Sequence, residues 1–166
     1  AEETGSWLGR QGKVLIIIDP AAGPLAEAQL DSLRKALKRQ GTVTVAAVEA
    51  VQPIDPLLRT MNPGGSGLSA ESFLKLIEAH PEATGVLSLA GFPELPPAAL
   101  QALKQKGCRC AAVLSAGLGP KLQAALQAKV LQWAVVPRWE EETPAAPPGQ
   151  TARDRFNQAY QLIKAP

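Results

Sequence analysis

The sequence has no hydrophobic run long enough to cross a lipid bilayer. Its most apolar stretch, residues 14–18, has five residues, whereas a membrane-spanning helix needs about 20. The chain also has little charge of either sign in excess, because its formal net charge is only +2. No overall field therefore attracts nucleic acid or an anionic membrane. We expect neither a nucleic-acid partner nor a membrane-spanning segment.

Histidine is scarce, and this limits the catalytic chemistry that the chain can support. The single histidine, His80, is expected at a helix end near the amino edge of the sheet. Ser88 and Ser115 follow strands at the carboxyl edge, about 17 Å away. A nucleophile needs a base within reach, and no G-x-S-x-G elbow is present. We therefore assign no catalytic residue and favour a protein that is not an enzyme.

Cysteine is nearly as scarce, and its spacing argues against a disulfide or a metal centre. Cys108 and Cys110 are too close for an unstrained bridge within one strand, so we expect two free thiols packed as small apolar residues. They would supply at most three zinc ligands together with His80, and no fourth is apparent. We expect no metal, with His80 contacting the last carbonyls of its helix.

Cofactor fingerprints are missing as well. The turn after the first apolar run reads Asp19-Pro-Ala-Ala-Gly23, which has neither the G-x-G-x-x-G spacing nor the lysine of a P-loop. Gly117-Leu-Gly119 is only a two-glycine turn. We therefore expect no cofactor.

The stretch 13–20 is the most informative feature that is present. Five continuous apolar residues end at Asp19 and Pro20, a pattern typical of a central parallel strand that is buried on both faces. Asp19 would then lie at the carboxyl end of the strand, where open α/β sheets bind their ligands. Asp19 also suits a turn-capping role, which we favour over acid–base pairing with Glu49 at the same edge. Both roles can hold together if a ligand hydroxyl or amine also bonds Asp19.

Apolar runs alternate with amphipathic segments along the chain. This pattern predicts an α/β fold, a single three-layer sandwich with a five-stranded, mostly parallel sheet. We expect the flavodoxin-like order 2-1-3-4-5, or else a Rossmann-like order. Strands are expected at 13–18, 42–48, 85–90, 108–114 and 130–136, and helices at 24–40, from Ser69 to His80, at 97–106, after Gly119 and at 151–164.

The chain is expected to form one α/β core with three further segments. Residues 1–12 are an entry segment, residues 13–139 the α/β core, and residues 140–150 a proline-rich surface loop. Residues 151–166 are expected to form a C-terminal helix packed on the core.

Several polar or glycine residues follow strands and are candidates for ligand binding at the carboxyl edge. These ligand-binding candidates are Asp19, Ser88, Gly91, Ser115, Gly117 and Arg138. A second set lies in the long connection that precedes the second helix, where amides and a helix N-terminus could converge on an anion. The anion-loop candidates are Gly64, Gly65, Ser66 and Gly67.

Aromatic side chains are few, at 4% of residues, so their positions are informative. Trp133 lies within the fifth strand and is expected to pack against a helix. Trp139, beside Arg138, is a candidate for a protein interface, because such pairs are common at interface hot spots.

The start of the chain points to export or trimming. It opens Ala1-Glu2-Glu3 without an initiator methionine, as signal peptidase would leave it. A boundary inside a longer protein explains this equally well. In its strand–helix alternation and this possible export boundary, the chain resembles a single lobe of the periplasmic ligand-binding folds. That resemblance implies a periplasmic or otherwise extracytoplasmic location.

These features favour a non-enzymatic binding or protein-interaction domain, an exported part of a larger protein or assembly. The alternative is a sensor or enzyme for a small anion or polar metabolite, bound at the carboxyl edge. The expected partner is accordingly a protein or a small polar ligand.

Overall fold

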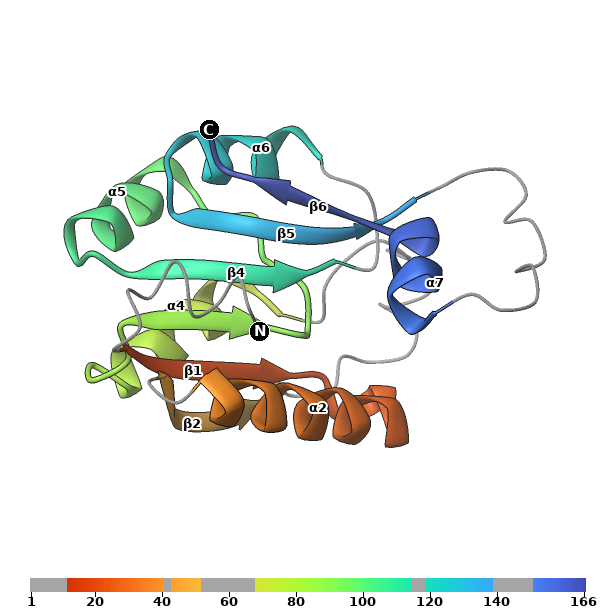
Figure 1. Ribbon diagram of the computed structural model, residues 1–166. Helices are drawn as coiled ribbons and strands as arrows, with labels where there is room; N and C mark the ends of the chain where they lie inside the picture. Colours follow the sequence, from red (N-terminus) through yellow and green to blue (C-terminus); the bar gives the residue numbers. More distant parts are fainter. Residues whose placement is uncertain (1–11, 41–42, 52–67, 115–118, 139–150) are drawn as a thin grey trace.

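The structure, a computed structural model, describes residues 12–40, 43–51, 68–114, 119–138 and 151–166 (Figure 1). The helices and strands, in chain order, are β1 (Gly12–Ile18), η1 (Pro20–Ala22), α2 (Pro24–Gln40), β2 (Val43–Ala50), α4 (Ala70–Ala79), β3 (Gly85–Ser88), α5 (Pro97–Gln105), β4 (Arg109–Val113), α6 (Pro120–Gln127), β5 (Leu131–Pro137), α7 (Ala152–Ala159) and β6 (Tyr160–Lys164). None of the helices described is both long and apolar enough to span a membrane.

One twisted sheet organises the fold, with the strand order β2-β1-β3-β4-β5-β6. Strands β1 to β5 are all parallel to their neighbours, and only β6 runs antiparallel to β5. The predicted α/β class and the order 2-1-3-4-5 are therefore confirmed for the first five strands. The sheet has six strands in place of the five expected.

Helices cover the sheet on both sides and make three layers (Figure 1). Helices α4, α5 and α6 contribute Phe73, Leu100 and Ala125 to the larger core cluster on one face. Helix α2 contributes Leu37 to a smaller cluster on the other face, and Trp133 of β5 lies in the same cluster. The predicted three-layer sandwich is confirmed.

Strand β1 is buried on both of its faces. The side chains of Val14, Leu15, Ile16 and Ile17 are each 0% exposed. Leu15 and Ile17 point into the larger cluster, while Val14 and Ile16 point into the smaller one. A continuous apolar run is the pattern that such a strand needs, because neither face can meet water.

Local signals begin and end the helices as their residue types predict. Helix α2 begins at Pro24, whose fixed φ suits a first helical position. The Ser69 hydroxyl accepts a hydrogen bond from the backbone N–H of Ser72 at 3.0 Å and caps α4. Gly107 follows α5 with a φ of +65°, a conformation that glycine adopts without strain.

The C-terminal segment differs from the prediction. The helix expected over residues 151–164 ends at Ala159, and residues 160–164 form strand β6. The sequence there is rich in β-compatible side chains, and pairing with β5 satisfies backbone groups that would otherwise lie on a free edge. Residues 1–11 and 139–150 lie outside the described residues, so the proposed division into segments stays a prediction.

Leu15→Ala should lower the free energy of unfolding by about 2–5 kcal/mol, because it leaves a cavity in a strand buried on both faces. Leu162→Ala is the matched control on β6, where the leucine is 39% exposed, and should change stability by about 0.5 kcal/mol or less. Urea unfolding measures both values. Equal losses in the two variants would contradict the assignment of β1 as the central strand.

The start of α7 supplies a pH-dependent contribution to stability. The Thr151 hydroxyl donates to Asp154 Oδ2 at 2.6 Å and the Thr151 backbone N–H donates to the same oxygen at 3.1 Å. These two bonds lower the pKa of the Asp154 carboxyl. The folded pKa lies below the unfolded one, so the stabilisation is present above the ordinary pKa and is lost as pH falls through the folded pKa.

Thr151→Ala should therefore raise the pKa of Asp154 towards its ordinary value, because the stronger of the two hydrogen bonds is removed. A carboxyl-carbon NMR titration measures the midpoint. Thr44→Ala, at an exposed position of β2, should leave that midpoint where it is. The capping box is disproved as the cause if Thr151→Ala leaves the titration unchanged.

Candidate functional site

The carboxyl edge of the sheet places Asp19 directly after the central strand. Asp19 Oδ1 accepts a hydrogen bond from the backbone N–H of Ala21 at 2.9 Å and caps the short helix η1. The turn-capping role predicted for Asp19 is therefore confirmed. The residues that follow β2 and β3 stay hydrogen-bonded to the end of β1. The backbone N–H of Val51 donates to Ile18 O at 2.9 Å, and that of Leu89 donates to Ile17 O at 2.8 Å.

Ser88 ends β3 next to β1 but does not face the edge. Val86, two residues earlier in β3, lies in the larger core cluster. Because side chains alternate along a strand, Ser88 points to the same face as Val86. Ser88 is fully buried, and its Oγ has no hydrogen-bond partner in the described structure. Gly91 follows in the β3 turn with a φ of +88°, which any residue with a Cβ adopts only under strain.

Arg138 lies at the same edge but far from Asp19. Strand β5 is separated from β1 by β3 and β4, so three strand spacings put the two residues about 14 Å apart. Arg138 Nε donates to the carbonyl oxygen of Tyr160 at 3.2 Å, and its backbone N–H donates to Ala159 O at 2.8 Å. Arg138 thus secures the junction of β5 with the C-terminal segment, and one small ligand does not bridge it to Asp19.

The remaining candidates lie outside the described residues. These are Ser115, Gly117, Gly64, Gly65, Ser66, Gly67 and Trp139. Their roles stay predictions.

The histidine makes contacts that the sequence did not suggest. His80 Nε2 lies 2.9 Å from Glu49 Oε1 of β2, and His80 Nδ1 lies 3.4 Å from Glu82 Oε1. The imidazole therefore joins two carboxylates in place of the helix-end carbonyls expected. The pKa of Glu82 is lowered, first by its own backbone N–H and further by His80. The Glu49 carboxylate is thereby paired with His80.

Both cysteines are free and buried, as predicted. A hydrogen bond between the two thiols lowers the pKa of Cys108 and raises that of Cys110, and burial raises the pKa of Cys110 further. Cys110 is thus an inert core thiol. Within the described ranges, no three side chains of His, Cys, Asp or Glu come together as metal ligands.

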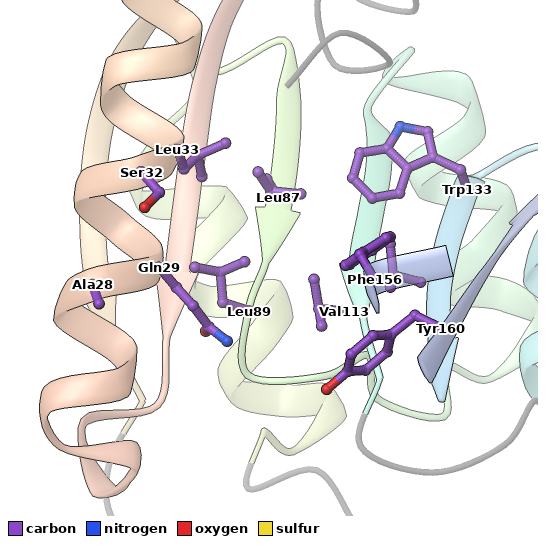
Figure 2. A pocket seen from close by; sticks show the side chains of 11 residues that line it. Ala28, Gln29, Ser32, Leu33, Leu87, Leu89, Val113, Trp133, Phe156 and Tyr160 are labelled. Carbon is purple, nitrogen blue, oxygen red and sulfur yellow. The ribbon is translucent and has the colours of Figure 1, made fainter. Parts of the chain in front are cut away.

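Sequence reasoning missed a cavity of about 510 Å³ on the α2 face of the sheet. It lies between α2 and the C-terminal segment, above strands β3, β4 and β5 (Figure 2). The described lining residues are Ala28, Gln29, Ser32, Leu33, Leu87, Leu89, Val113, Trp133, Val135, Phe156 and Tyr160. A signal was present: the strands direct apolar side chains to this face, and of the long amphipathic helices in the described residues only α2 packs on it.

Comparison with solved structures shows where this fold occurs. The chain superposes on AraP, an arabinose binding protein from Geobacillus stearothermophilus, with a TM-score of 0.62 and 11% identity, over 99% of this chain and 58% of that one. An ABC transporter solute-binding protein from Burkholderia graminis, in complex with D-arabinose, gives 0.53 and 19%, over 81% and 44%. One from Bacillus halodurans with bound myo-inositol gives 0.54 and 14%, over 81% and 43%.

The chain shares its fold with one part of each of these solute-binding proteins. The identities are low, so the likeness concerns the fold alone. This chain spans about half the length of these structures. No protein-family model and no curated protein sequence matches the chain.

Ser88→Ala tests the state of the buried hydroxyl at the end of β3. Since the Oγ has no partner in the described structure, its removal should raise the free energy of unfolding by about 1 kcal/mol. Thermal and urea unfolding of the unliganded protein measure the change. A clear loss of stability would show that the hydroxyl is satisfied, and would contradict the unpaired state.

Proposed function

We propose that this chain is a non-enzymatic domain that binds a small uncharged polar molecule, of the sugar or polyol class, outside the cytoplasm. The observation that carries this proposal is the Asp19 carboxylate at the carboxyl end of β1. In the order β2-β1-β3, connections from β1 and β3 leave towards opposite faces, and open α/β sheets bind ligands at this point.

The chemistry of Asp19 favours a hydroxylated ligand over an anion. A carboxylate accepts hydrogen bonds and donates none, and in this structure Asp19 accepts one from the Ala21 N–H. Sugar hydroxyls donate to such an oxygen, whereas a phosphate or carboxylate would be repelled by it. The half-buried position of Asp19 strengthens a charge-assisted hydrogen bond relative to one in open water.

The fold likeness supports this proposal better than the protein-partner role that the sequence favoured. Three of the similar structures are of solute-binding proteins with bound D-arabinose, D-allose and myo-inositol. Three such hydroxylated molecules on one fold make this chemical class the first to test. The extracytoplasmic location is proposed on the same ground, since one similar solute-binding protein is described as periplasmic.

The test is calorimetric titration of the purified chain with D-arabinose, D-allose and myo-inositol. Asp19→Asn should weaken binding at least tenfold, because a hydrogen bond to a charged group contributes about 1.5–3 kcal/mol. Asparagine caps a helix as well as aspartate does, so the turn is retained. Asp31→Asn, at an exposed position of α2, is the matched control and should bind as the parent does.

Two results would overturn the proposal. One is the absence of a binding heat with all three compounds. The other is binding that Asp19→Asn and Asp31→Asn leave equally unchanged, which would place the ligand elsewhere on the molecule.

A further inference from the structure

We propose that the cavity between α2 and α7 is a second binding site, which takes an uncharged aromatic molecule with one polar end. The cavity uses the face of the sheet that α2 covers in part, and the sugar site proposed above uses the carboxyl edge around Asp19. The second proposal shares no residue with the first. Either can fail without the other.

The body of the cavity is apolar. Leu87, Leu89 and Val113 form its floor, at and just beyond the ends of β3 and β4, and Leu33 of α2 forms one wall (Figure 2). The volume of about 510 Å³ falls within the ordinary range for small-molecule sites. A ligand gains affinity here by removing apolar surface from water.

Aromatic rings line the wall opposite α2. Phe156 and Tyr160 stack with their ring centroids 5.2 Å apart and their planes at 24°. They remain 46% and 37% exposed, among the few large hydrophobic side chains with such exposure in the described structure. A flat ring fits beside such a pair, because aromatic rings stack in offset or edge arrangements.

The described lining has few polar groups, and one of them, Ser32, lies on α2 beside Leu33 (Figure 2). At the carboxyl end, the side-chain amide of Gln29 and the hydroxyl of Tyr160 point towards one another across the opening (Figure 2). At the other end lies Trp133, 7% exposed, whose indole N–H has no hydrogen-bond partner in the described structure. Figure 2 draws this nitrogen on the edge of the ring that points away from the other labelled lining side chains, so Trp133 closes this end of the cavity with the apolar part of its ring.

Charge decides the class of ligand. None of the described lining residues carries a charged side chain, so nothing there would compensate a buried phosphate, carboxylate or ammonium group. A sugar is disfavoured as well, because the Leu and Val floor offers its many hydroxyls no partner. What remains is an uncharged ring system whose hydroxyl lies between Gln29 and Tyr160.

The experiment uses 2-naphthol as the probe and naphthalene as the probe without a polar end, each followed by calorimetry and by the thermal midpoint. Both should bind the parent chain and raise its midpoint. Tyr160→Phe should weaken 2-naphthol roughly fivefold, the effect of one neutral hydrogen bond. The same variant should leave the affinity for naphthalene unchanged, because both rings are retained.

A matched pair of variants tests the location. Ala28→Trp places a large ring at the rim of the cavity and should abolish binding of both probes. Ala124→Trp makes the same change at an exposed position of α6, on the other face of the sheet, and should have no effect. Both alanines are exposed on helices, so both variants are expected to fold.

The opposite results would overturn the proposal. Failure of 2-naphthol to bind would do so, as would equal losses in Ala28→Trp and Ala124→Trp. Analytical sedimentation tests whether a second copy of this chain occupies the cavity. If the parent chain is a dimer and Ala28→Trp dissociates it, a second copy fills the cavity, and the proposal of an aromatic ligand is overturned.

Discussion

All the other elements of the fold are arranged around a strand with no exposed side chain between residues 14 and 17. Burying those four branched side chains requires a strand on each edge of β1 and a layer of helices on each face. Strands β2 and β3 supply the edges, and α2 and the α4–α6 layer supply the faces. Rigid packing of β1 also holds Asp19 in place, since Asp19 follows the strand without an intervening residue.

The architecture could be predicted because its determinants are local. A continuous apolar run, a proline at the start of α2, a serine before α4 and a glycine after α5 each act on neighbouring residues. Strand β6 escaped prediction because Phe156, Tyr160 and Ile163 have the i, i+4, i+7 spacing of a helix face. Pairing of β6 with the open edge of β5 is a tertiary effect, and it overrode that spacing.

The same distinction between local and tertiary determinants applies to the candidate sites. The cap made by Asp19 spans two residues and was predictable from the Asp-Pro turn. The contact of His80 with Glu49 joins residues 31 apart, and periodicity does not encode such a pair. The cavity is harder still, because it arises where the described helices α2 and α7 cover the apolar strand residues only in part. A sequence shows which side chains are apolar. Which of them the helices leave uncovered depends on the topology of the whole fold.

The reversed direction of β6 has a consequence for how the domain is held. It brings the chain back to the edge where β1 begins, and the backbone N–H of Ala165 bonds Gln132 O, near the start of β5, at 2.8 Å (Figure 1). A linker, fusion partner or surface anchor joined after Pro166 would therefore leave from the amino edge. The opposite edge, with Asp19, would then lie on the far side of the sheet from the attachment.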